Sequence, residues 1–272
     1  MTKTLRFAAS LLLLLMFLAG CQKHQAIEPE EIVLHLDDEG KFTVDTKATA
    51  VTALPSSLYW GMTYSNGTTK QATTSKSVSS SKISTGYYQT LSPTTYIHYV
   101  SNLNFTAGGA MTVANNGTDV IVGKSSSSSA TPSVSLNHIF ARTGTLTCNT
   151  QSGYSISNVS WTITSYGSTT GTAGTYNVSS LSWTARSAAL SETTINSSSD
   201  LYLIPGEYTI KVSYTLSKGD YSQSFTKSGR VTLSAGNVNN ISCTASGGAA
   251  QEIVISLSLT AWSSTNKEFT LS

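Results

Sequence analysis

Apolar and polar residues alternate with a period of two along most of this chain, as they do in β-strands that bury one face. The stretch from Tyr208 to Leu216 has an apolar side chain at every second position. The spacing of three and four residues that marks an amphipathic helix is almost absent. The pattern therefore predicts an all-β fold of antiparallel strands with close turns, as in a β-sandwich. Further strands are predicted at 31–36, 41–44, 57–64, 95–100, 119–122, 134–140, 154–163, 231–233, 238–243 and 253–262.

A serine-rich stretch, Gly123 to Pro132, interrupts this alternation near the middle of the chain. Such a composition is typical of a linker or a long loop. The length of 272 residues also fits two domains better than one. We therefore predict one β-domain over residues 48–131 and a second over 132–272. Residues 70–86 are polar and give no clear pattern.

The first 21 residues differ from all that follow. Lys3 and Arg6 precede an uninterrupted apolar run, and small residues lead from this run to Cys21. A short apolar segment behind positive charge is typical of a cleaved export signal and is short for a membrane span. Its end, Leu-Ala-Gly-Cys, resembles the lipobox of bacterial lipoproteins; the alternative is an ordinary secretory signal with a chance cysteine. The resemblance implies that residues 1–20 are removed between Gly20 and Cys21 and that Cys21 carries lipid.

The charge of the chain limits its partners. It has 16 basic and 14 acidic residues, and removal of the signal segment takes away two of the basic ones, which leaves no net charge. No basic patch suited to nucleic acid is present. Charged residues make up 11% of the chain, well below the roughly 25% of a typical domain, whereas hydrophobic residues at 39% are sufficient for a core. This composition favours an extracytoplasmic β-protein whose exposed strand faces carry Ser and Thr.

Cys148 and Cys243 are the only cysteines after Cys21. Each continues the apolar face of a predicted strand, behind Leu146 and Ile241 respectively. An oxidising compartment permits a disulfide between them. Two buried free thiols are the alternative, and the pattern leaves both open.

Residues that support catalysis are sparse. The chain has four histidines and no motif that pairs a nucleophile with a base, holds zinc or cradles phosphate. We therefore predict no enzyme activity, no metal and no cofactor. His138 is interpreted as a strand histidine hydrogen-bonded at the domain boundary, and the acidic stretch 37–39 as a solvated turn rather than a cation site.

Aromatic residues gather in the first half of the chain and suggest a second function. They are suited to a platform on which sugar rings stack, although half-buried strand aromatics are the more common explanation. The residues concerned are Tyr59, Trp60, Tyr64, Tyr87, Tyr88, Tyr96 and Tyr99.

Several segments, taken in order and together with the lipobox, resemble the fimbrillin family of Bacteroidetes, the subunits of lipoprotein-derived pili. They are spread over most of the mature chain: Val44–Thr49, Tyr96–Val100, Asp119–Gly123, Val134–Arg142, Tyr202–Tyr208, Leu233–Asn239 and Ile253–Trp262. The resemblance implies two tandem transthyretin-like antiparallel β-sandwiches. It also implies a structural or adhesive pilus subunit at the cell surface, anchored to the outer membrane through lipid, with other subunits and a surface ligand as partners. A glycan-binding surface lipoprotein is the alternative.

The family also implies an assembly mechanism. A trypsin-like protease cuts after a basic residue, the first strand is lost, and a strand from a neighbouring subunit fills the groove that opens. In this chain the cut would lie between Lys47 and Ala48, with Lys where the family usually has Arg, and would remove residues 21–47. The strand to be displaced carries Ile32, Leu34, Leu36, Phe42 and Val44, and the donor is expected near the C-terminus, where Phe269 and Leu271 are the large apolar residues after Trp262.

Overall fold

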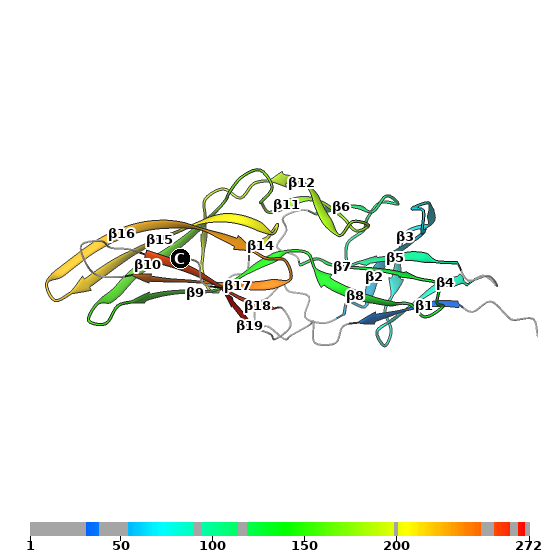
Figure 1. The fold of residues 1–272 in the computed structure, drawn as a ribbon, viewed down its shortest axis with the longest axis horizontal. Coiled ribbons are helices and arrows are strands. Elements are labelled where there is room, and N and C mark those ends of the chain that lie inside the picture. The colour runs from blue at the N-terminus through cyan, green and yellow to red at the C-terminus, as the bar shows by residue number, and fades with distance from the viewer. Residues whose placement is uncertain are drawn as a thin grey trace, which may run out of the picture.

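The computed structural model describes residues 31–37, 54–89, 94–113, 119–198, 201–245, 253–261 and 266–269. Within these residues every regular element is a β-strand (Figure 1). The predicted all-β fold is therefore confirmed. The described residues contain no helix long and apolar enough to cross a membrane.

The first half of the chain forms a seven-stranded sheet. Its strands, in spatial order, are β3 (Thr69–Ser77), β2 (Ser57–Tyr64), β5 (Tyr96–Ser101), β7 (Ile121–Ser127), β8 (Ser133–His138), β1 (Glu31–Asp37) and β4 (Lys82–Tyr88). The first and last strands of this order, β3 and β4, are joined by a tight turn in which Ser79 bridges to Lys82. The sheet therefore curls around a single core, made of Ile32, Leu34, Leu36, Leu58, Trp60, Met62, Ile83, Tyr96, Val100, Ile121, Val134 and Leu136.

The second half forms a sandwich of two sheets. One contains β13 (Thr193–Ile195), β10 (Ser155–Ser165), β15 (Gly206–Lys218) and β16 (Tyr221–Leu233). The other contains β14 (Tyr202–Leu203), β9 (Ala141–Thr150), β17 (Asn237–Ala245), β18 (Ile253–Ala261) and β19 (Asn266–Phe269). Apolar side chains of both sheets meet in one core, which includes Trp161, Ile163, Tyr208, Ile210, Val212, Ile241, Cys243 and Leu257.

A third, small sheet connects the two halves. It consists of β12 (Ser182–Ala188), β11 (Ala173–Asn177) and β6 (Ala110–Val113), so a strand of the first half pairs with a hairpin of the second. The small sheet lies between the two halves (Figure 1). A separate core there contains Tyr99, Phe105, Met111, Val122, Phe140, Tyr176 and Tyr202 among its members. The Trp183 side chain also donates a hydrogen bond to the Ile139 carbonyl at 3.2 Å. The halves are therefore packed together, not joined by a bare linker.

The serine-rich stretch differs from the prediction of a linker. β7 continues as far as Ser127, with its backbone paired to β5, and a short turn leads directly into β8. β8 is paired to β7 and to β1, so it belongs to the first sheet and the chain crosses to the second half after His138. Serine fits such a strand because its backbone is satisfied by pairing while its small hydroxyl faces water.

Two strand pairs are parallel, although the pattern predicted antiparallel pairing throughout. β1 pairs parallel to β8, and β9 pairs parallel to β17. The partners lie far apart in sequence, so the connection between them is a long crossover and not a hairpin turn. All other described pairs of neighbouring strands are antiparallel, consistent with the predicted sandwich architecture.

His98 lies on β5 inside the first core and has no exposed surface. The indole N–H of Trp60 donates to its Nδ1 at 3.4 Å, so that this ring nitrogen is an acceptor. Burial disfavours the charged imidazolium and lowers the pKa of His98 from 6.5 to about 4. His98 is therefore neutral in the folded protein at neutral pH.

The first half is expected to lose stability as the pH falls from about 6.5 to about 4. In this window the histidine binds a proton in the unfolded chain but not in the folded one, which favours unfolding by up to about 3 kcal/mol; above pH 6.5 the term vanishes. Denaturant midpoints measured by tryptophan fluorescence across this range test it. The His98→Gln variant keeps an acceptor for Trp60 and cannot titrate, so an unchanged pH dependence in this variant contradicts the assignment.

Candidate functional site

The strand predicted to be displaced, β1, is an interior member of the first sheet. It pairs antiparallel with β4, where Leu34 lies opposite Ile83, and parallel with β8, where Leu36 lies opposite Val134. Its alternate side chains point into the core: Ile32 and Leu34 have no exposed surface and Leu36 is 5% exposed. Three of the five apolar residues that the sequence assigns to this strand thus share one buried face.

Hydrogen bonds hold both edges of β1. On the β8 side, the Val33 and His35 amides donate to the carbonyls of Ala130 and Pro132 at 2.8 and 2.9 Å. On the β4 side, the Leu36 amide donates to the Ser81 carbonyl at 2.9 Å. Both neighbours of β1 would therefore have unpaired backbone groups if the strand were absent.

Hydrogen bonds that involve side chains join the start of β1 to residues 84–86 of β4 and add to this pairing. The Thr85 hydroxyl donates to the Ile32 carbonyl at 2.6 Å, and the Gly86 amide donates to the Glu31 carboxylate at 2.9 Å. A further hydrogen bond from the Ser84 hydroxyl is the main cause that lowers the pKa of Glu31 below its usual value. Glu31 is therefore an ionised acceptor that fixes the register of the first residue of β1.

Removal of β1 would leave a strand-shaped slot. Its floor would be apolar, because Ile83, Val134 and Leu136 are buried neighbours of β1 in the same core. Its walls would be the free edges of β4 and β8, one antiparallel and one parallel to the lost strand. An apolar slot between two free strand edges is a template for another extended chain with alternating apolar residues.

The remaining predicted site residues do not lie in β1. Gly20, Cys21, Phe42, Val44, Lys47, Ala48 and Leu271 lie outside the described residues. Phe269, predicted in the donor, lies in β19 opposite Leu257 of β18. β19 ends the strand order of its sheet, so it is an edge strand within the part of the chain that the structure describes.

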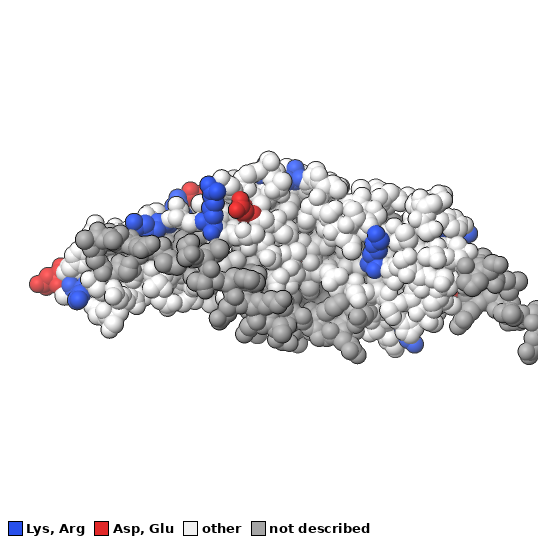
Figure 2. Space-filling view, in the orientation of Figure 1, with Lys and Arg blue, Asp and Glu red and all other residues white. Residues whose placement is uncertain are grey.

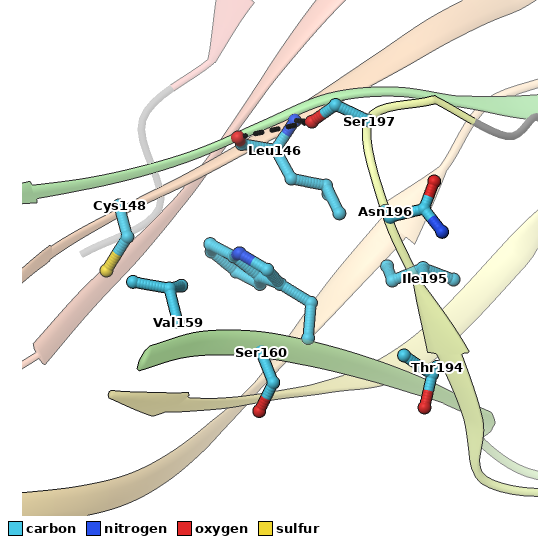
Figure 3. A pocket seen from close by; sticks show the side chains of 9 residues that line it. Leu146, Cys148, Val159, Ser160, Thr194, Ile195, Asn196 and Ser197 are labelled. Carbon is cyan, nitrogen blue, oxygen red and sulfur yellow. Dashed lines mark hydrogen bonds between the residues drawn. The ribbon is translucent and has the colours of Figure 1, made fainter. Parts of the chain in front are cut away.

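A hollow opens at the side of the second sandwich, with a volume of about 390 Å³. Figure 3 shows Leu146 and Cys148 on β9 facing Val159 of β10 and Ile195 of β13 across it. The Ser197 hydroxyl closes one end, where it accepts a hydrogen bond from the Leu146 amide at 3.0 Å. The sequence placed Cys148 on a strand face but gave no signal for this hollow, because it depends on two sheets meeting.

Cys148 and Cys243 lie opposite each other on β9 and β17. Both are free thiols in the structure, and their Sγ atoms are 2.6 Å apart as hydrogen-bonded partners. The sequence left a disulfide and two buried thiols as alternatives, and the structure brings the two side chains into contact.

His138 occupies the position predicted for it. It ends β8, and its Nδ1 lies 2.7 Å from a carboxylate oxygen of Asp119, two residues before β7. Asp119 has no exposed surface and His138 is 7% exposed. Beside the pair, the Ile139 amide donates to the Val120 carbonyl at 3.0 Å, at the point where the chain leaves the first sheet.

Six of the seven aromatic residues are buried or half-buried strand residues, as the more common explanation expects, and the alternative of a sugar-binding platform fails at Trp60. Trp60 has no exposed surface, and Tyr96 and Tyr99 are also buried in the cores. These rings cannot stack on a sugar without unfolding the sheet. Among the seven aromatic residues considered, Tyr88 is clearly exposed, at 58%, and a single ring is not a platform.

The exposed surface also gives little support to a charged binding patch or a metal site. Figure 2 shows scattered charged side chains on the visible face, in keeping with the low charge content of the chain. Within the described residues no group of three or more His, Cys, Asp or Glu side chains is placed to hold a metal ion.

No protein-family model matches the chain, and no curated protein matches it in sequence. Solved structures do match. A fimbrilin from Porphyromonas gingivalis has a TM-score of 0.53 at 10% identity, over 88% of this chain and 99% of that one. A fimbrial protein from Bacteroides vulgatus has a TM-score of 0.52 at 13% identity, over 86% of this chain and 99% of that one.

The chain has the fold of these fimbrial proteins. A candidate cell adhesion protein from Parabacteroides distasonis adds a TM-score of 0.56 at 9% identity, over 88% of this chain and 98% of that one. The predicted resemblance to fimbrillins is therefore confirmed for the fold. Because each match covers 86% or 88% of this chain, it extends over both halves.

Proposed function

We propose that this chain is a structural or adhesive subunit of a cell-surface pilus, exported as a lipoprotein and assembled by addition of a strand from one subunit to the next. The observation that carries the proposal is the position of β1. Its three buried side chains belong to the first core, yet it is the first described strand of the chain and the basic residue Lys47 follows it. The likeness to fimbrial and adhesion proteins supports the same role.

In the proposed sequence of events, lipid on Cys21 carries the chain to the membrane. Two or more acyl chains hold a protein stably at a bilayer, so the anchor lasts until the chain is cut. A cut between Lys47 and Ala48 would separate the lipid and β1 from the rest of the chain. The lipid would then be a temporary handle for export, and the mature subunit would begin at Ala48.

The free energy gained when an apolar strand fills the position of β1 is substantial. Full burial of Ile32, Leu34 and Leu36 is worth on the order of 5–9 kcal/mol before the cost of ordering the strand. Once the peptide bond is cut, β1 is a separate segment and can be replaced by a strand from another subunit. Such a strand recovers the apolar burial and also pairs with β4 and β8, so assembly is favourable.

The donor is expected at the C-terminus, with Phe269 and Leu271 as its apolar residues. β19 pairs with β18 over a short register of four residue pairs, from Leu257 with Phe269 to Thr260 with Asn266. An edge strand with so few pairs detaches more easily than an interior strand. This supports β19 and the residues after it as the segment passed to the next subunit.

Limited digestion of the purified full chain with trypsin tests the proposal. The expected products are a core that begins at Ala48 and, at raised concentration, polymers of this core that resist detergent. N-terminal sequencing identifies the cut, and light scattering or electron microscopy follows polymer formation.

The matched control is the double variant Lys41→Ala, Lys47→Ala, which removes both basic residues between β1 and β2 and so keeps β1 joined to the rest of the chain. It is expected to remain monomeric under the same digestion. The proposal fails if the wild-type core that starts at Ala48 stays monomeric after β1 has been separated from it under mild denaturant and diluted back.

A further inference from the structure

The two cysteines of the second sandwich are arranged for reaction with each other. Cys148 and Cys243 are register partners on the neighbouring strands β9 and β17, so their side chains lie on the same face of the sheet. Neighbouring strands lie about 4.7–4.9 Å apart, within the Cα separations of about 4.4–6.8 Å that disulfides span. The Sγ atoms are already 2.6 Å apart, so bond formation needs little movement of the backbone.

The two thiols differ in their surroundings. Cys148 is half-buried and lines the hollow beside Val159, whereas Cys243 is 1% exposed in the sandwich core. The hydrogen bond from the Cys243 thiol lowers the pKa of Cys148, and the same bond together with burial raises the pKa of Cys243. A reagent can therefore reach one sulfur, which is also the better nucleophile of the two.

We propose that Cys148 and Cys243 are a redox pair, in which Cys148 attacks an external disulfide through the hollow and Cys243 resolves the product. In the first step the Cys148 thiolate bonds to one sulfur of the external disulfide and releases the other as a thiolate. In the second, Cys243 loses its proton and its sulfur displaces the remaining external thiolate from Cys148. Two protein thiols are oxidised and one external disulfide is reduced to two thiols.

The bond would change the second sandwich as a whole. It would join β9 covalently to β17, and β17 carries β18 and β19 on its other side. The bridged cysteines are 95 positions apart, so the bond would close a long loop of the unfolded chain. The oxidised protein is therefore expected to unfold at a higher denaturant concentration than the reduced protein.

The test uses oxidised glutathione as the external disulfide and the full chain with Cys21→Ser, which leaves these two cysteines as the only thiols. Mass spectrometry of the folded protein is expected to show loss of both thiols with no glutathione retained. In the Cys243→Ser variant one glutathione is expected to stay on Cys148. In the Cys148→Ser variant, Cys243 should react at least about tenfold more slowly.

The proposal is overturned if Cys148 and Cys243 both stay free thiols in the folded Cys21→Ser chain, or if glutathione remains attached to this chain. Equal reaction rates of the two single variants would overturn the order of attack. Circular dichroism confirms that each variant is folded, and the first measurement needs neither variant. The redox proposal rests on the proposed pilus function only for the oxidising compartment in which the protein would lie. Its test involves neither cleavage at Lys47 nor polymer formation, so the redox proposal and the pilus proposal can fail separately.

Discussion

Replacing Leu34 with aspartate is expected to release β1 from the first sheet without any proteolysis. Leu34 has no exposed surface and lies opposite Ile83 in the first core. Loss of a buried leucine side chain alone typically costs about 2–5 kcal/mol, and a carboxylate in its place adds the cost of burying an unpaired charge. We expect the first half to be destabilised by more than about 5 kcal/mol, measured as a fall in its denaturant midpoint.

The neighbouring residue supplies the matched control. His35 lies on the same strand but on the opposite face and is half-buried, so His35→Asp introduces the same carboxylate outside the core. Its effect on stability is expected to stay within about 1 kcal/mol. A similar loss in both variants would mean that aspartate weakens β1 through its strand propensity and not through burial.

The Leu34→Asp variant also separates displacement of β1 from cleavage. If an empty slot between β4 and β8 is what drives assembly, the uncut Leu34→Asp chain should polymerise, or bind a synthetic peptide of residues 31–37, whereas uncut wild type should do neither. An uncut variant that is destabilised but binds no strand would contradict the proposed role of the slot.

Much of this architecture could be predicted from local pattern. The strands at 57–64, 134–140, 208–216 and 253–262 each appear near the predicted place. In β8 and β15 the buried residues alternate with more exposed ones, as the sequence pattern does. The apolar positions of the predicted strand 154–163 change parity between Ile156 and Val159, and β10 has a break in register between Ser157 and Ser160. β3, β4 and the turn between them were not predicted, since polar residues predominate in both strands.

The serine-rich stretch shows why composition alone misled. Gly123 was taken as the start of a linker, but it lies in β7, opposite Leu136 of β8. A Cβ at this position would be 2.6 Å from a Val134 methyl group and 2.8 Å from the Ser135 carbonyl, so glycine is required by packing. A single sequence does not distinguish glycine needed for close approach from glycine needed for flexibility.

The candidate site also has parts that could be predicted from the sequence and parts that could not. The buried face of β1 and the role of His138 could be predicted, because both follow from residues close together in the chain. The parallel pairing of β1 with β8, and of Cys148 with Cys243, could not, because no local signal encodes which distant strand becomes a neighbour. The burial of Trp60 also depends on the sheet closing around it, which the aromatic content did not indicate.

Breaking the pair of His138 and Asp119 is expected to be the other large effect in this chain. Asp119 has no exposed surface, and its carboxylate lies 2.7 Å from His138 Nδ1. His138→Leu removes this partner from a buried carboxylate, which typically costs about 3–5 kcal/mol. The free energy of unfolding, measured by denaturant titration at neutral pH, gives the loss directly.

A double-mutant cycle distinguishes the pair from simple loss of packing. The double variant His138→Leu, Asp119→Leu removes both polar groups, so it is expected to be more stable than either single variant, because neither residue then loses the other as its hydrogen-bond partner. Additive losses would show that the two residues act independently. The pair lies where β8 ends and the chain crosses to the second sandwich, next to the hydrogen bond from Ile139 to Val120. Its loss should therefore also loosen the junction between the halves, and proteolysis after residue 138 should become faster in the single variants than in the double variant.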